Sequence, residues 1–330
     1  MRGRVVITGV GAVTPLGTGA RTLLRRWAAG EVGIEDGVAR CDFDPASVLT
    51  TKEVRRTDRF AQLALAASDE ALAEAGWGDG PPCDPERVGC VIGTGIGGIG
   101  TIEAQHDVMR ERGAKLVSPL SIPLMMGNAA AGTVAMRHGL RGQSYSVASA
   151  CAAGAHAIGA AARMIQAGDA DAVLAGGTES ALTGLARAAF AAMGATSELG
   201  VSRPFDARRD GFVMGEGAGV IVLEDADAAA LRGARVLGEL IGYGASSDAY
   251  HLTAPEPNGG GAARAIRAAL RDAGIEPGEV DYVNAHGTST PLNDRAETAA
   301  LRAGLGDAAA ERVPISSTKS AIGHLLGAAG

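Results

Sequence analysis

The sequence predicts an α/β protein in which helices pack on β-sheets in layers. Short stretches with β-branched centres alternate with longer alanine-rich stretches along the 330 residues, as expected for strands and helices of such a fold. Hydrophobic residues make up 46% of the chain but aromatic residues only 3%, which favours tight helix-on-sheet packing over a few aromatic anchors. The 49 glycines are spread along the chain and indicate turns and close backbone approaches rather than disorder.

A first series of five strands is expected in the N-terminal part. It opens at residues 4–9 (RVVITG), and an amphipathic helix over residues 59–76 is ended by glycine. The other four strands of this series are expected at residues 88–93, 144–149, 170–176 and 212–224.

A second, related series of strands is expected in the C-terminal part. Its strands are expected at residues 236–243, 280–285 and 314–317, with a helix over residues 261–273. A five-strand series followed by a partial second one indicates internal duplication. We therefore expect an N-terminal half at residues 1–235 and a C-terminal half at residues 236–330, in one globule because no linker separates them.

Charge and cysteine content exclude several classes of protein. The chain carries 30 basic and 37 acidic residues, a net charge of −7, which argues against nucleic acid as the main partner. No apolar run has membrane-spanning length and no signal-peptide pattern is present, so we expect no membrane association. The cysteines lack zinc-ligand spacing, which predicts a reduced, cytoplasmic enzyme. They are Cys41, Cys83, Cys90 and Cys151.

Cys151 is the first candidate for chemistry. It follows a strand-like stretch at residues 143–149 (QSYSVAS) and precedes an alanine-rich helical stretch at residues 152–164. Unpaired backbone N–H groups and the helix dipole at such a junction favour an anion, so a lowered thiol pKa is expected. The alternative is a small cysteine packed in the core.

Two histidines and a lysine follow predicted strands near the end of the chain. His286 is followed by glycine and hydroxyl residues, a placement typical of ligand sites in α/β sheets. His324 follows the strand at residues 314–317, with Lys319 five residues before it. Taken singly, each has a simpler interpretation, as a turn histidine or a solvated lysine. Together with Cys151 they indicate a catalytic site.

Motifs along nearly the whole chain resemble the β-ketoacyl-acyl-carrier-protein synthases (synthase II type), condensing enzymes of fatty-acid and polyketide synthesis in the thiolase-like superfamily. These motifs occur in the same order as in the family, and they are specific to it. The matching segments are residues 6–11 (VITGVG), 14–17 (TPLG), 150–151 (AC), 202–206 (SRPFD), 209–212 (RDGF), 215–219 (GEGAG), 246–251 (SSDAYH), 284–291 (NAHGTSTP) and 316–330 (SSTKSAIGHLLGAAG).

The resemblance implies a thiolase-like α-β-α-β-α layering built from two duplicated halves. Family members continue past the motif that ends at Gly330 with a helix, two strands and a glycine-rich loop that supplies an oxyanion N–H. We therefore expect the second half to be incomplete here and the 330-residue piece alone to be inactive, whereas the full-length form should be active.

The resemblance also implies a mechanism. Cys151 would hold the acyl group as a thioester, and a malonyl thioester would then lose carbon dioxide and attack it. His286 and His324 would be the N–H donors to the developing enolate, Lys319 would support His324, and the Cys151 backbone N–H would be an oxyanion donor. No metal or nucleotide cofactor is implied, because the substrates are carried on the phosphopantetheine of acyl carrier protein.

Other residues match positions that handle the substrate. Thr288 and Thr290 resemble residues lining the phosphopantetheine tunnel, and Phe190 resembles an acyl-pocket residue. The carrier is acidic, and the basic residues Lys52, Arg55 and Arg56 resemble its docking surface, with a solvated helix end as the alternative. Gly194 stands where many relatives carry a basic residue. The family implies a homodimer, or a heterodimer with a related subunit.

Three alternative functions remain. Residues 93–98 (GTGIGG) satisfy the dinucleotide-binding pattern and suggest an NAD(P)-dependent oxidoreductase, but Glu111, the acidic residue about 20 positions on, lies in a charged helical run. A chain-length-factor-like partner subunit would lack the nucleophile that Cys151 provides. A thiolase would need a second cysteine late in the chain, and none lies beyond Cys151.

Overall fold

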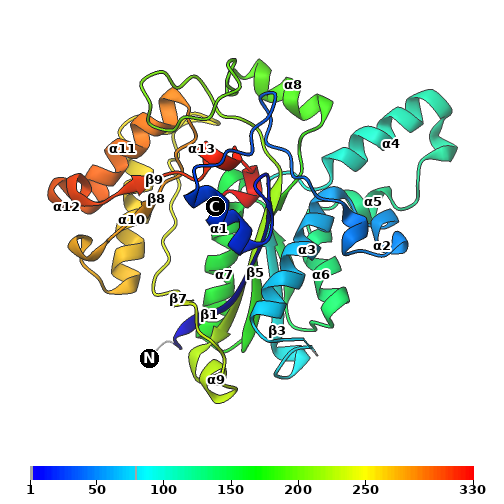
Figure 1. Cartoon of the computed structure of the whole chain (residues 1–330), viewed down its shortest axis with the longest axis horizontal. Helices are drawn as coiled ribbons and strands as arrows, with labels where there is room; N and C mark the ends of the chain where they lie inside the picture. The colour runs from blue at the N-terminus through cyan, green and yellow to red at the C-terminus, as the bar shows by residue number, and fades with distance from the viewer. Residues whose placement is uncertain (1–2, 79) are drawn as a thin grey trace.

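The computed structural model describes residues 3–78 and 80–330, and its largest element is a mixed seven-stranded sheet (Figure 1). The strand order is β2-β1-β6-β5-β3-β4, and β7 also pairs with β1. β5 runs parallel to β3 but antiparallel to β6, so the sheet changes direction at its centre. The strands are β1 (Val5–Thr14), β2 (Gly17–Thr18), β3 (Val88–Gly93), β4 (Ser144–Val147), β5 (Ala172–Glu179), β6 (Gly217–Asp225) and β7 (Gly238–Glu239).

Helices cover both faces of this sheet. α3 (Arg59–Glu74) and α6 (Ala129–His138) pack on one face and α7 (Ala153–Ala167) on the other. Side chains alternate between these faces: Ile92 belongs to the core cluster under α3, whereas its neighbour Val91 belongs to the cluster under α7. Every residue of β3 and β5 is buried, as expected for strands covered on both sides.

Most of the C-terminal part lies on the α7 side of this sheet, away from α3 and α6 (Figure 1). It contains a two-stranded parallel sheet of β8 (Val283–Asn284) and β9 (Ile315–Ser316), with α10 (Gly260–Ala273) and α11 (Pro291–Leu305) packed against each other beside it. The remaining helices are α1 (Ala20–Ala28), α2 (Thr51–Arg55), α4 (Ile99–Arg112), α5 (Ser121–Met125), α8 (Gly184–Ala192), α9 (Ala226–Leu231), α12 (Asp307–Arg312) and α13 (Lys319–Ile322).

The layered α/β fold predicted from the sequence is confirmed. Among the described residues, no helix combines the length and apolarity that crossing a bilayer requires. The strand at residues 88–93 and the helix at 261–273 were predicted to within one residue, and the first strand is longer than expected, ending at Thr14.

Several predicted strand boundaries were wrong. Only Gly238–Glu239 of the strand expected at residues 236–243 is paired, and it joins β1 of the first sheet rather than opening a second one. The strand expected at residues 212–224 begins at Gly217. The strands expected at residues 280–285 and 314–317 are each paired over two residues. Strand assignment requires a hydrogen-bonded neighbour, which an apolar run in the sequence does not reveal.

Candidate active site

Cys151 lies on a sharp elbow between β4 and α7. Ala150 has φ of 50°, a left-handed conformation that is uncommon outside glycine and is held only where the surroundings impose it. Cys151 follows in a single 3-10 turn (Ala150–Ala152), and α7 begins at Ala153. The elbow thus presents the thiol at the end of the sheet, in the manner of strained strand-to-helix turns that carry nucleophiles.

His324 donates a hydrogen bond to this thiol. Its Nε2 lies 3.0 Å from Cys151 Sγ, and its Nδ1 accepts the backbone N–H of Leu326 at 3.2 Å. Because Nδ1 is an acceptor, the neutral ring carries its proton on Nε2, and this proton points at sulfur.

His286 completes the cluster from the loop after β8. Its ring stands nearly perpendicular to that of His324, with 5.4 Å between centroids. The backbone N–H groups of His286 and Gly287 both donate to the Glu297 carboxylate on α11, at 2.6 and 2.7 Å. Glu297, which the sequence analysis missed, therefore fixes this loop.

Both histidines are neutral near pH 7. Burial lowers the pKa of His286 to about 3, and the nearby charge of Lys319 acts in the same direction. Burial also lowers the pKa of His324 well below its usual value, with further contributions from His286 and Lys319. These rings are therefore suited to donate hydrogen bonds rather than to store a proton.

The pKa of the Cys151 thiol differs from the expectation drawn from the sequence. Burial raises its pKa more than Lys319 and a backbone N–H lower it, so the predicted lowering by the helix terminus is wrong. Lys319, on α13, is 5% exposed, and burial lowers its own pKa, while Glu297, Cys151 and Asp294 oppose this change. The charge of Lys319 is the largest of the effects that lower the pKa of the Cys151 thiol.

The cluster also contains metal-ligand types. Cys151 Sγ and one ring nitrogen each of His286 and His324 lie within 4.8 Å of one another. A metal needs a lone pair on His324 Nε2, but that nitrogen carries the proton while Leu326 occupies Nδ1. The arrangement fits hydrogen-bond donation better than metal ligation.

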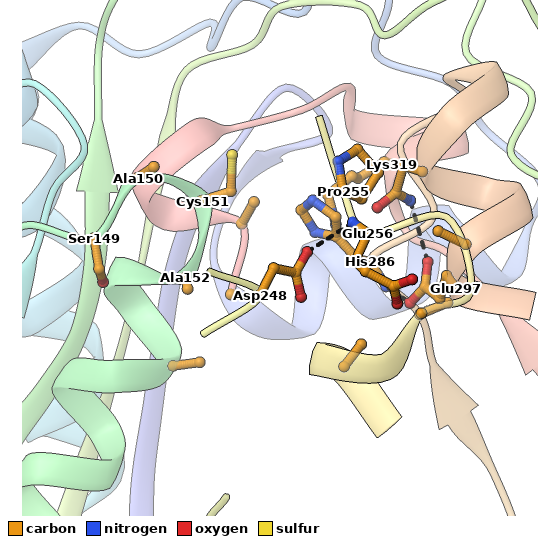
Figure 2. Close-up of a pocket in the computed structure, with 18 of the residues that line it drawn as sticks. Ser149, Ala150, Cys151, Ala152, Asp248, Pro255, Glu256, His286, Glu297 and Lys319 are labelled. Carbon is orange, nitrogen blue, oxygen red and sulfur yellow. Dashed lines mark hydrogen bonds between the residues drawn. The ribbon is translucent and has the colours of Figure 1, made fainter. Parts of the chain in front are cut away.

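Two cavities meet at Cys151 and His286. One, of about 680 Å³, is lined by Ser149, Glu297 and Lys319, and Figure 2 shows Cys151 on one side of it with His286 and Lys319 across from it. The other, of about 850 Å³, is lined by the predicted substrate residues. These are Phe190, Thr288 and Thr290.

The predicted docking residues lie elsewhere, on the surface. Lys52, Arg55 and Arg56 are exposed on α2 or directly after it. Arg59, their neighbour in sequence, turns inward and forms a bidentate ion pair with the fully buried Glu216. Lys52, Arg55 and Arg56 therefore form the exposed basic cluster, and Arg59 is not part of it.

The GTGIGG loop has a structural role. The backbone N–H groups of Gly95 and Ile96 donate to the carboxylate of Glu179, so donors that would hold a pyrophosphate are occupied by the chain itself. A Cβ on Gly98 would lie 2.5 Å from Leu124 O in α5. This environment disfavours the dinucleotide interpretation. Glu179 was missed, although an acidic residue closing a buried strand is visible in the sequence.

Comparison with known proteins gives a consistent result. The model described as beta-ketoacyl synthase, N-terminal domain, matches residues 39–229, and the corresponding C-terminal domain model matches residues 237–330. The chain is 46% identical to 3-oxoacyl-[acyl-carrier-protein] synthase 2 of Rhizobium meliloti over 354 aligned positions, covering 99% of this chain and 83% of the relative.

Solved structures show the same likeness. The ishigamide ketosynthase/chain length factor superposes with a TM-score of 0.91 at 33% identity, covering 100% of this chain and 83% of that one. A type II PKS acyl-carrier protein in complex with its ketosynthase bound to the hexaketide gives a TM-score of 0.89 at 33% identity, covering 100% and 84%.

Proposed function

The chain belongs to the β-ketoacyl synthase family, and from this premise we propose that it condenses an acyl group with a malonyl group on acyl carrier protein in the cytoplasm. The product is a β-ketoacyl carrier protein, one step of fatty-acid or polyketide elongation. The observation that carries the proposal is the Cys–His–His cluster, in which the Nε2–H of His324 points at Cys151 Sγ.

The first half-reaction loads the enzyme. The thiolate of Cys151 attacks the thioester carbonyl of the acyl carrier, the carrier's C–S bond breaks, and the departing phosphopantetheine thiolate takes up the proton that the Cys151 thiol gave up. The positive charge of Lys319 favours the thiolate. Neither histidine holds the thiol proton, because burial lowers the pKa of both rings.

The second half-reaction forms the new carbon–carbon bond. A malonyl thioester loses carbon dioxide, and the released electron pair delocalises onto the thioester oxygen as an enolate. The Nε2–H of His324 and the neutral ring of His286 donate to this oxygen. The carbanion carbon then attacks the acyl carbonyl on Cys151, and the Cys151 thiolate is released. These steps use only side chains, backbone N–H groups and carrier-bound substrates.

The substrates reach the cluster through the cavity lined by Thr288 and Thr290, with Phe190 beside the acyl chain. The exposed Lys52, Arg55 and Arg56 contact the acidic carrier. A solved relative that is itself a ketosynthase bound to its acyl-carrier protein supports this partner.

We further propose that the chain acts as a dimer, with itself or with a related subunit. β4 is the last strand of the seven-stranded sheet and, among the residues that the structure describes, pairs with β3 alone, so its outer edge is available for pairing. Sedimentation of the pure protein separates the two cases, because a chain that requires a related subunit stays monomeric alone.

Mass spectrometry tests the function directly. Incubation of the full-length form with an acyl carrier should add one acyl mass to the Cys151 peptide, and subsequent malonyl carrier should remove it as β-ketoacyl carrier. Label on Cys41, Cys83 or Cys90 with an unmodified Cys151 would contradict the mechanism. The Cys90→Ala variant is a matched control, because Cys90 is buried in β3, where burial raises its pKa to about 12.

A further inference from the structure

We propose that Glu179 is a positioning residue for the condensation, because its buried carboxylate holds the turn that aims His324 at Cys151. The inference rests on the proposed function and adds a residue that none of the catalytic steps above uses. Glu179 closes β5, at the centre of the seven-stranded sheet, and its side chain is fully buried.

Four hydrogen-bond donors surround this carboxylate. Oε1 accepts Thr94 Oγ1–H at 2.8 Å and Ile96 N–H at 3.3 Å. Oε2 accepts Gly95 N–H at 2.6 Å and Gly327 N–H at 3.0 Å. Each oxygen therefore has two donors, which favour the charged form, but burial outweighs them and raises the pKa of this carboxyl above its usual value.

The bond to Gly327 connects Glu179 to the catalytic histidine. Gly327 directly follows Leu326, whose N–H donates to His324 Nδ1 and so places the ring proton on Nε2. Leu326 has φ of 47°, an unfavourable conformation for a leucine that persists only where neighbouring contacts impose it. The Glu179–Gly327 bond is one such contact, at the next residue along the turn.

The packing around the carboxylate is too tight for the turn to relax toward it. A Cβ on Gly327 would lie 2.4 Å from Gly95 N and 2.8 Å from Glu179 Oε2. A Cβ on Gly177 would lie 2.4 Å from Gly327 O. Gly95, Gly177 and Gly327 thus let the turn after His324 pack directly against the end of the first sheet, beside Glu179.

A glutamine cannot replace this carboxylate. Three of the four donors are backbone N–H groups with fixed directions, so either orientation of the amide places its NH₂ against at least one of them. Glu179→Gln therefore keeps the shape of the side chain but removes one of its two accepting oxygens, and the loss of charge weakens the bonds that remain, including the one to Gly327. A rival role is purely electrostatic, because the charge of Glu179 raises the pKa of Cys151.

The test compares Glu179→Gln with Glu224→Gln in the intact protein. Glu224 is also buried, on the neighbouring strand β6, where it accepts from Thr8 and pairs with Arg232. We expect Glu179→Gln to lower kcat roughly 100-fold with little change in KM, as for a misplaced catalytic group, whereas Glu224→Gln keeps the parent kcat.

Nuclear magnetic resonance of ¹⁵N-histidine-labelled protein provides a readout independent of activity. The His324 signal, identified by its loss in His324→Ala, should report the Nε2–H tautomer in the parent and a mixture of tautomers in Glu179→Gln. If Glu179→Gln does not fold, Thr94→Val, which removes one donor, should give the same changes in smaller degree.

Two results would overturn the inference. One is an equal kcat for Glu179→Gln and Glu224→Gln. The other is an unchanged His324 tautomer together with faster alkylation of Cys151, which would assign Glu179 the electrostatic role instead. A parent protein that forms no β-ketoacyl product would refute the proposed function, while the tautomer comparison would still decide the role of Glu179.

Discussion

The seven-stranded sheet and the C-terminal two-stranded sheet contribute to the site by different means. β5 and β6 pair over eight residues, whereas β8 and β9 pair over two. The larger sheet places Cys151 through regular backbone pairing that ends in one sharp elbow. Around the smaller one, His286 and His324 lie in short turns and Lys319 lies on the short helix α13.

These turns are held by side chains that bond to backbone N–H and C=O groups. Glu297 fixes the His286 loop, Ser317 donates to Gly287 O at 2.8 Å, and Glu179 reaches across from the first sheet to Gly327. The position of the nucleophile thus depends on sheet formation, and the His286 loop depends on buried polar contacts, whereas His324 combines such a contact with backbone bonds to Val213 and Gly215. Four experiments test this difference.

Substitutions in the Cys–His–His cluster should have the largest effect. Those at Cys151 and those at the histidines should impair different steps of the reaction. Cys151→Gln should abolish condensation yet retain malonyl decarboxylation, because both histidine donors remain. His286→Ala or His324→Ala should lower decarboxylation roughly 100- to 1,000-fold, the usual cost of one such donor. Release of carbon dioxide from malonyl carrier measures this step. The exposed His106→Ala is the control, and parent-rate decarboxylation by either histidine variant would disprove its role.

Equivalent core truncations should reveal the difference in packing. Leu174, fully buried in β5, lies in the large cluster under α3, whereas Leu301, in α11, lies in a small cluster with two other buried residues. Leu174→Ala should lower the free energy of unfolding by about 4 kcal/mol and Leu301→Ala by about 2 kcal/mol, since the smaller cluster can collapse around the cavity. Urea unfolding measures both, and equal losses would show that the two regions are packed alike.

Charge reversal on α2 should separate docking from chemistry. Lys52→Glu, Arg55→Glu or Arg56→Glu should each raise KM for carrier-bound substrates by roughly tenfold at low salt and less at high salt. KM for a free pantetheine thioester should not change, because that substrate bypasses docking. Arg25→Glu, an exposed arginine on α1, is the control. Equal effects on both substrates would contradict a docking role.

The smallest expected effect concerns the pH dependence of the thiol. Because burial raises the pKa of Cys151, its alkylation by iodoacetamide should accelerate as pH rises through the alkaline range. Lys319→Met removes a charge that lowers this pKa, so the profile should move to higher pH. The exposed Lys115→Met should leave it in place. A profile for Lys319→Met that coincides with the parent's would show that the lysine does not stabilise the thiolate.

Fold class and family could be read from the sequence, and so could the prediction of a site at Cys151, His286, His324 and Lys319, residues that the structure brings together. Strand periodicity and specific local motifs are written in consecutive residues, so β3 and α10 were also predicted almost to the residue. Local signals fail where a strand needs a distant partner, which is why residues 236–243 were assigned to the wrong sheet.

How these residues act together depends on contacts that exist only in the folded chain. The contact of His324 Nε2 with Cys151 Sγ, the bond from Gly327 to Glu179 and the packing of the GTGIGG loop on Glu179 all join segments far apart in the chain. The thiol pKa also changed direction for this reason. Burial depends on everything packed around Cys151, whereas the helix terminus that suggested a lowered pKa is a local feature.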